Sequence, residues 1–456
     1  LSLERILMST EKGQWSSYWT FILATSGAAV GLGNIWKFPY IVGENGGGAF
    51  VLVYLVCIGL IGIPLMIAEV MLGRAGGLDP QTSMKQLAIN YKVPKYWSGL
   101  GAMLILAGFL ILSYYCVIAG WALAYVFKAG SGAFLGGSSE QINHLFSNLT
   151  NSPYELAFWH TVIITATISI VAMGVEKGLE KAVIYLLPTM VVLLLIIVGY
   201  SISTGFFAKG LMFLFSPNVS KLTSHGILVA VGHAFFTLSL ATGSIMMYGA
   251  YLPKSISISK TCFYIALADT AIALLAGLAI FPIVFSHGLE PGAGPGLIFK
   301  SLPLAFGHME YGTIFGTVFF IMLVFAAFTS AIALLEPSVA WLVNRFKLSR
   351  IKASFSAGLG IWLLGFPTIF SFNIWQHVKI LGLNCFDFLD SLTANIMLPI
   401  GGLLTAVFAA WIVKDAYKEL NLEPNSLSFK LWRYSLGIIT PVAIIIVFLN
   451  AIGIFK

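Results

Sequence analysis

The chain has 456 residues, of which 58% are hydrophobic and only 9% are charged. Soluble domains carry about 25% charged residues, so this composition argues against a water-soluble enzyme. The net charge of +7 is not clustered into the basic face that nucleic-acid binding requires. The composition therefore indicates a polytopic membrane protein.

Eleven apolar runs are long enough to cross a bilayer, which takes about 20 helical residues. The expected spans are 19–41, 48–73, 99–127, 157–174, 179–203, 226–250, 261–286, 311–343, 353–370, 390–413 and 432–454. Connections on the side of the N-terminus would hold most of the Lys and Arg residues, and such charges favour the cytoplasmic side. We therefore expect a cytoplasmic N-terminus, an outer C-terminus and a location in the plasma membrane, which in a bacterium is the inner membrane.

The four cysteines lie in or beside these apolar runs and show no CxxC spacing. They are Cys57, Cys116, Cys262 and Cys385. This pattern favours neither a disulfide framework nor a metal site.

Two of the spans carry clusters that disfavour a continuous helix. Residues 26–34 in the first span hold three glycines and an asparagine, and residues 236–244 in the sixth are polar at every second or third position. Glycine costs about 1 kcal/mol per helical position relative to alanine, so each cluster marks a place where a helix can break. Close helix packing through small residues is the alternative interpretation of each cluster alone.

The positions of the two clusters favour the first interpretation. Spans 1 and 6 are five apart, so spans 6–10 would repeat spans 1–5 with inverted topology. Paired broken helices in inverted halves are typical of secondary transporters with a midplane site. We expect one transmembrane domain over 1–456, with repeats at about 19–203 and 226–413 and an extra span at about 432–454.

The first span continues into a distinctive motif. Residues 31–48 read Gly-Leu-Gly-Asn-Ile-Trp-Lys-Phe-Pro-Tyr-Ile-Val-Gly-Glu-Asn-Gly-Gly-Gly, and further matching motifs are Gly62-Ile63-Pro64-Leu65, Glu69, Gly73-Arg74, residues 235–240 and residues 328–330. Together they strongly resemble the neurotransmitter:sodium symporter family. Eleven spans without a twelfth resemble its bacterial branch, which includes the tyrosine and multiple-hydrophobic-amino-acid transporters and the leucine transporter LeuT. The resemblance implies an all-α, LeuT-like fold.

The resemblance also implies a substrate site. In the family, backbone N–H groups at the break of span 1 and a tyrosine of span 3, here Tyr115, hold the substrate carboxylate. Gly31 stands where monoamine carriers have an aspartate, which leaves the negative charge to an α-amino acid. Taken alone, Ile111 and Leu334 would be interpreted as packing residues. The implied substrate-binding residues are Ala29, Gly31, Leu32, Gly33, Ile111, Tyr115, Phe236, Thr237, Ser239, Thr242, Ser330, Ala333 and Leu334.

A first sodium site is implied beside the substrate carboxylate. Its ligands would be the Ala29 carbonyl, Asn34, Thr237 and Asp269. A carboxylate at mid-span is costly and is therefore a functional candidate. Tyr54 matches a chloride-associated position of the family, but His233 and Ala273 depart from it, so we expect Asp269 to supply the charge and chloride to be unnecessary. A structural Asp269 paired with His233 is the alternative.

A second sodium site is implied between spans 1 and 8. Its ligands would be the carbonyls of Gly27, Val30 and Ala326 and the hydroxyls of Thr329 and Ser330. Ser and Thr in spans often bond only their own helix backbone, which is the alternative. Gly178 and Pro188 resemble a family motif that unwinds span 5 to hydrate this site, although a simple proline kink would explain them as well.

Gate residues follow from the same resemblance. The outer pair would be Lys37 and Asp390, and the inner latch would be Lys12, Trp15 and Tyr251. The family usually has arginine at Lys37, and lysine lacks its bidentate fork. Asn344 replaces the aspartate of the inner latch, so the sequence does not explain how the inner side is held shut.

Two carboxylates within the spans have other expected roles. Glu69 is expected to satisfy backbone N–H groups at the break of span 6, as structural support for the site. Glu336 could relay protons, or it could cap a neighbouring helix beside Pro337.

The sequence thus predicts sodium-coupled symport of apolar, aliphatic or aromatic L-amino acids by alternating access. Two sodium ions are expected, with chloride independence. A proton-coupled carrier using Asp269 or Glu336 and a non-transporting amino-acid sensor are the alternatives. An enzyme is not expected, because no nucleophile–base arrangement or cofactor motif is present. The expected partners are the amino acid and the lipid bilayer, with no nucleic acid, and the expected state is a monomer or weak dimer.

Overall fold

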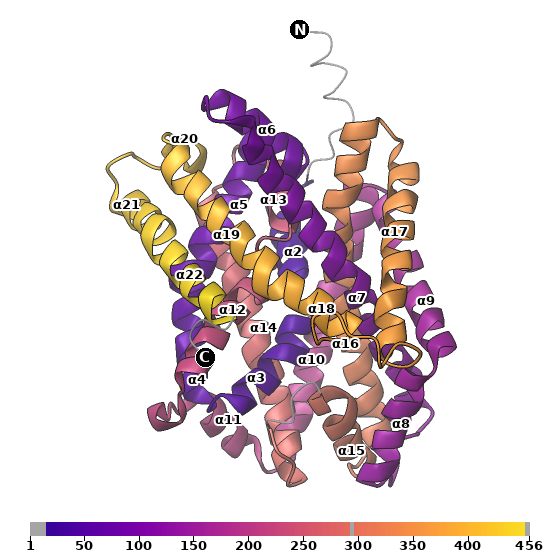
Figure 1. Ribbon diagram of the computed structural model, residues 1–456. Coiled ribbons are helices and arrows are strands. Elements are labelled where there is room, and N and C mark those ends of the chain that lie inside the picture. The colour runs from indigo at the N-terminus through magenta and orange to yellow at the C-terminus, as the bar shows by residue number, and fades with distance from the viewer. Residues whose placement is uncertain (1–14, 292–295, 452–456) are drawn as a thin grey trace.

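The computed structural model describes residues 15–291 and 296–451, in which every regular element is a helix (Figure 1). The first half contains α2 (Tyr18–Ala29), η1 (Gly33–Lys37), α3 (Phe38–Glu44), α4 (Gly48–Cys57), η2 (Ile58–Gly62), α5 (Ile63–Gly76), α6 (Pro80–Asn90), α7 (Ser98–Gly130), α8 (Ser139–Asn151), α9 (Pro153–Ala172), η4 (Val175–Glu180), α10 (Lys181–Ser203) and α11 (Phe207–Phe215). The second half contains α12 (Ser224–Thr237), α13 (Ser244–Ala250), α14 (Ile258–Ser286), η6 (Leu297–Ser301), α15 (Leu302–Gly307), α16 (Gly312–Phe346), α17 (Arg350–Ser371), α18 (Cys385–Ser391), η7 (Leu392–Met397), α19 (Leu398–Val407), η8 (Phe408–Ile412), α20 (Ala416–Leu420), α21 (Leu427–Tyr434), η9 (Ser435–Ile439) and α22 (Thr440–Ala451). The prediction of an all-α fold is confirmed.

Nine helices in the described part are long and apolar enough to cross a membrane. They coincide with nine expected spans, and the other two, 19–41 and 226–250, are interrupted helices. Ends differ by a few residues: the tenth span begins at Cys385 rather than 390, because the Asn384 side chain caps the backbone N–H of Asp387. The count of eleven and the cytoplasmic N-terminus remain predictions.

The first interruption lies between α2 and η1. The helix α2 begins with a capping box in which Ser17 and Thr20 bond each other's backbone N–H groups, and it ends at Ala29. Val30 then adopts an extended conformation, with φ −71° and ψ 109°. The chain resumes as a helix at Gly33. The glycine cluster therefore breaks the span, as predicted.

The second interruption lies between α12 and α13. Ser239, Ala241 and Gly243 all have positive φ, at 52°, 59° and 78°. This conformation costs a non-glycine residue about 1–2 kcal/mol. The break is held by Glu69 of α5, whose Oε1 accepts a hydrogen bond of 2.6 Å from the Ala241 N–H.

The helices α5 and α13 touch through their backbones. A Cβ on Gly73 of α5 would collide with the Met246 carbonyl, and one on Gly249 of α13 would lie 2.6 Å from the Val70 carbonyl oxygen. No side chain separates the two helices at these positions. This contact joins the second half of span 2 to the second half of span 6.

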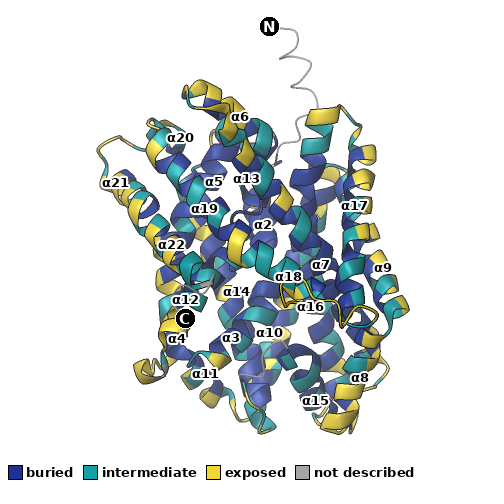
Figure 2. Ribbon diagram, viewed as in Figure 1, coloured by how far each residue is buried: buried dark blue, intermediate teal, exposed yellow. Residues whose placement is uncertain are grey.

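The most buried helices surround the two breaks. Figure 2 shows α2, α7 and α14 mainly buried, whereas α9, α17, α21 and α22 expose one side. The exposed residues on these outer helices are largely apolar, as Phe158 and Leu363 illustrate, which is what a lipid environment favours. The interior of the bundle therefore holds the polar breaks away from lipid.

Candidate functional site

A small cavity lies between the two breaks, against α7 and α16. It encloses about 30 Å³, room for about one water, so an amino acid requires the surrounding side chains to move apart. It is lined by Ala29, Gly31, Leu32, Gly33, Ile111, Tyr115, Phe236, Ser239, Leu240, Thr242, Ser330, Leu334 and Leu398. Most of the sequence-predicted set therefore comes together. Thr237 and Ala333 are buried but do not line this cavity, whereas Leu240 and Leu398 do and were not predicted.

The break of span 1 presents backbone N–H groups beside Tyr115. The Leu32 N–H donates to the Tyr115 hydroxyl at 3.3 Å, and the Gly31 N–H donates to Asn34 Oδ1 at 3.0 Å. A Cβ on Gly31 would clash with the Ser330 hydroxyl and lie 2.9 Å from the Tyr115 oxygen. A Cβ at position 31 would therefore require the Ser330 side chain to move. N–H groups and a phenol at a helix break are donors suited to a carboxylate.

Asn34, Thr237 and Asp269 form a fully connected buried cluster next to this cavity. Asn34 Nδ2 donates to Asp269 Oδ1 at 2.7 Å and to Thr237 Oγ1 at 3.1 Å, and the Thr237 hydroxyl donates to Asp269 Oδ2 at 2.9 Å. Each of the three side chains is at most 1% exposed. Amide, hydroxyl and carboxylate oxygens are the ligands that a hard cation prefers. The three side chains expected at a first sodium site therefore meet, and the Ala29 residue whose carbonyl was expected there lines the adjacent cavity.

His233 does not pair with Asp269. Its ring stacks on Phe38 at 5.8 Å and lies 5.5 Å from the Tyr54 ring. Neither ring nitrogen, nor the Tyr54 hydroxyl, has a hydrogen-bond partner among the described residues. The structural pairing that the sequence left open is therefore wrong for this structure.

The groups expected at a second sodium site lie between α2 and α16. The Ser330 hydroxyl is 3.2 Å from the Val30 carbonyl oxygen and 3.5 Å from that of Gly27. The Thr329 hydroxyl donates to the Ala326 carbonyl at 3.0 Å, within its own helix. The break at Val30 is what turns its carbonyl toward α16. The Ser330 hydroxyl thus faces two of the expected carbonyl ligands, and the Thr329 hydroxyl and the Ala326 carbonyl lie together on α16.

The outer gate residues are not in contact. Lys37 Nζ lies 4.3 Å from the centre of the Phe236 ring, and Asp390 accepts a hydrogen bond of 3.3 Å from the Tyr114 hydroxyl. No ion pair joins Lys37 to Asp390 in the described part of the chain, so the expected gate contact is wrong for this structure. A flexible ammonium group can form a cation–π interaction with an aromatic ring instead of an ion pair. A cavity of about 990 Å³ opens beside Lys37 and Phe236.

The aromatic residues expected at the inner latch pack against one another. Trp15 is 3% exposed, its Nε1 donates to the Tyr248 carbonyl at 3.3 Å, and its ring packs edge-on against Tyr248 and Tyr251. Lys12, the expected cation of the latch, lies outside the described residues. Asn344 donates to the Asp79 carboxylate at 2.8 Å, which links α16 to the cap of α6.

Glu336 is the centre of an inner charge cluster that the sequence did not reveal. Its carboxylate accepts two hydrogen bonds from Arg350, at 3.0 and 2.5 Å, and one from the Tyr251 hydroxyl at 2.6 Å. Glu336 is fully buried, and Tyr251 and Arg350 also line a cavity of about 720 Å³ on this side. Glu336 thus joins the end of α13 to α16 and α17, and its hydrogen bonds among the described residues go to side chains and cap no helix end.

Comparison with known proteins agrees with this arrangement. The model of the sodium:neurotransmitter symporter family matches residues 12–139 and 133–456. The chain belongs to this family. As a family member it is a sodium-coupled, multi-pass transporter of the plasma membrane and not an enzyme.

The symporter is also similar to individual transporters. It is 38% identical to the sodium-dependent transporter YhdH of Bacillus subtilis, over 98% of this chain and 100% of the relative. It is 31% identical to the sodium-dependent transporter MJ1319 of Methanocaldococcus jannaschii, over 97% of this chain and 91% of that transporter. The human sodium- and chloride-dependent GABA transporter 2 is 25% identical, over 86% of this chain and 68% of that transporter. MhsT, whose crystal structure was determined in complex with L-phenylalanine, is 44% identical in sequence to this chain. The two structures superpose with a TM-score of 0.88, over 96% of this chain and 99% of MhsT.

Proposed function

We propose that the symporter moves apolar L-amino acids together with two sodium ions and without chloride. The observation that carries this proposal is the juxtaposition of the Leu32 N–H and Tyr115 hydroxyl with the cluster of Asn34, Thr237 and Asp269. One side of the site offers donors for a carboxylate, and the adjoining side offers oxygen ligands for a cation.

The lining of the cavity supports an apolar substrate. None of its lining residues carries a charged side chain, so a charged substrate side chain would be buried without a counter-ion, at a cost of several kcal/mol. Apolar burial there contributes roughly 25 cal/mol per Å². The structure of MhsT with L-phenylalanine gives a 44% identical neighbour that accepts such a molecule.

The position of Asp269 supports chloride independence. A fully buried carboxylate already provides a negative charge beside the expected cation, so a second anion is not needed for neutrality. Ser330, Val30 and Thr329 supply the neutral oxygen atoms of the second ion site. The substrate carboxylate would complete the first site.

Uptake into proteoliposomes tests the proposal. Purified protein is assayed with radiolabelled L-phenylalanine, L-leucine and L-glutamate, with external sodium or potassium and with chloride or gluconate as the anion. We expect sodium-dependent accumulation of phenylalanine and leucine in both anions, and none of glutamate. Sodium-independent uptake would contradict the ion sites, and loss of uptake in gluconate would contradict the role of Asp269.

A further inference from the structure

A groove far from the transport site lies where the helices η8 and α21 meet the connection between them. Its volume is about 310 Å³, within the range of about 300–1,000 Å³ of small-ligand sites. It is lined by Ala410, Trp411, Pro424, Phe429, Lys430, Arg433, Tyr434, Gly437 and Ile438.

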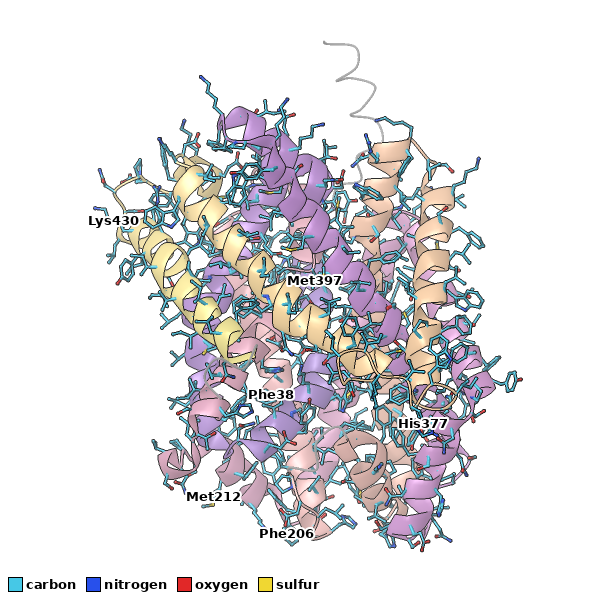
Figure 3. The ribbon with its side chains drawn as sticks, viewed as in Figure 1. Phe38, Phe206, Met212, His377, Met397 and Lys430 are labelled. Carbon is cyan, nitrogen blue, oxygen red and sulfur yellow. The ribbon has the colours of Figure 1, made fainter. Side chains whose placement is uncertain are left out.

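Two cations line the groove without an acidic partner. Arg433 Nε donates to the Ala410 carbonyl at 3.0 Å, and its guanidinium lies 5.9 Å from the centre of the Phe429 ring. Lys430 is exposed at the outer edge of the molecule (Figure 3). Neither residue forms an ion pair in the described part of the chain, and no lining residue is acidic.

Neighbouring cations are paired instead. Arg74 lies 3.5 Å from the Glu419 carboxylate, and Lys418 lies 3.5 Å from that of Asp415. Lys414, just after η8, also forms no ion pair among the described residues, but it does not line the groove, so Lys430 and Arg433 are the unpaired cations of its lining. An anionic group in the groove would receive a charge-assisted hydrogen bond from each.

The base of the groove is built by close packing of two η8 side chains against a glycine of η9. A Cβ on Gly437 of η9 would lie 3.3 Å from the Ala410 Cβ and 3.4 Å from Trp411 Nε1. Trp411 Nε1 donates to the Gly437 carbonyl at 3.2 Å, which fixes the indole as one wall. The base of the groove is thus set by contact between η8 and η9.

Its position is the boundary between hydrocarbon and water. The long apolar helix Cys385–Ile412 ends just before this groove and the next, Leu427–Asn450, begins beside it, so we expect both to reach the membrane surface at this end. Trp411 and Tyr434 are 61% and 57% exposed, and aromatic rings of this kind favour the headgroup level. The groove is therefore reached from the bilayer.

We propose that this groove binds the headgroup of an anionic phospholipid, with its phosphodiester between Lys430 and Arg433 and its acyl chains along the apolar side of α22. Basic pockets between spanning helices at a membrane surface have the chemistry to hold such headgroups. The proposal is independent of the transported substrate.

Native mass spectrometry of the delipidated full-length protein tests it. Dioleoyl-phosphatidylglycerol, dioleoyl-phosphatidylcholine and glycerol 1-phosphate are titrated separately. We expect one tightly bound phosphatidylglycerol, weaker phosphatidylcholine and no detectable glycerol phosphate. Each cation near a membrane surface contributes about fivefold, so Lys430→Gln with Arg433→Gln weakens phosphatidylglycerol binding roughly thirtyfold.

The control removes two charges from the same end of the molecule, with Lys85→Gln and Lys92→Gln, and leaves phosphatidylglycerol binding unchanged. If the double groove variant does not fold, Lys430→Gln alone serves, because the side chain is exposed, and it weakens binding about fivefold. Equal binding of both lipids, or equal loss in groove and control variants, overturns the proposal. Tight binding of glycerol phosphate would assign the groove to a free phosphate ester and overturn the lipid assignment.

Discussion

Glu336 and Arg350 form a bidentate ion pair between α16 and the start of α17, with hydrogen bonds of 3.0 and 2.5 Å. The carboxylate is fully buried, whereas the side chain of Arg350 is 26% exposed. Tyr251, at the end of α13, donates a third bond to the same carboxylate. The pair thus ties the end of a broken span to two continuous ones.

Arg350→Ala leaves the Glu336 carboxylate buried without its cation, and we expect a loss of roughly 3–5 kcal/mol in stability. The thermal unfolding midpoint of the purified protein measures this loss. Adding Glu336→Gln to Arg350→Ala removes the unpaired charge and restores part of the stability. A double variant no more stable than Arg350→Ala would show that the charge of Glu336 is not the cause.

Asp269→Asn removes the negative charge from the first ion site. We expect sodium-dependent phenylalanine binding to fall at least tenfold, about 1.4 kcal/mol, in gluconate, and to recover when chloride is added, because the unpartnered Tyr54 hydroxyl can donate to an anion nearby. Scintillation proximity measures the binding. Glu310→Gln, a change to an exposed carboxylate, is the control. Undiminished binding by Asp269→Asn in gluconate would contradict the need for this charge.

Gly31→Ala places a methyl group against the Ser330 hydroxyl and 2.9 Å from the Tyr115 oxygen. Overpacking of this kind costs about 1–3 kcal/mol, so we expect phenylalanine affinity to fall about tenfold or more. Gly59→Ala is the matched control, since a Cβ there meets nothing within 4 Å. If both variants bind phenylalanine like the parent protein, position 31 does not border the substrate.

Glu69→Ala leaves the Ala241 N–H unpaired at the break of span 6. An unsatisfied buried donor costs about 1–3 kcal/mol, so the unfolding midpoint is expected to fall. Glu69→Gln keeps an acceptor oxygen for this N–H and is expected to retain most of the stability. Equal destabilisation by the two substitutions would show that the hydrogen bond of 2.6 Å is not what matters.

Tyr91 and Asp415 predict a pH dependence outside the spans. The Tyr91 hydroxyl donates to Asp415 Oδ1 at 2.5 Å, and this bond lowers the pKa of the Asp415 carboxyl below its ordinary value. A lowered carboxyl pKa stabilises the folded state above the unfolded pKa, about 4, and that contribution is lost as pH falls through the folded pKa. We expect Tyr91→Phe to lower the unfolding midpoint at pH 7 but to lower it less at pH 3. An equal difference at both pH values would contradict this origin.

The sequence predicted the elements whose signals are local. The glycines around Gly31 and the polar run around Thr237 indicated both breaks, because helix interruption depends on residues adjacent in the chain. The sequence indicated a functional role for Asp269, because a carboxylate within an apolar span is costly and seldom lacks a function. The side chains of Asn34, Thr237 and Asp269, which the family resemblance grouped, do meet.

What the sequence did not predict depends on long-range packing or on one choice among several conformations. The pairing of Glu336 with Arg350 needs the chain to reverse at Lys347, which has a φ of 55°. The contact of Lys37 with Phe236 in place of Asp390 is a side-chain choice that no local pattern encodes. Short amphipathic helices such as α8 were absent from the prediction, because a search for apolar runs passes over them.

The backbone contact of Gly73 and Gly249 makes the second half of span 6 and the second half of span 2 one mechanical body. A helix joined to its neighbour without intervening side chains cannot slide or tilt on its own, since main-chain atoms offer no rotamers to absorb the movement. Any rearrangement that opens the inner side must therefore carry α5 with α13. Glu69, which holds the break just before α13, lies on α5 and would move with it, so the bend of span 6 would keep its support.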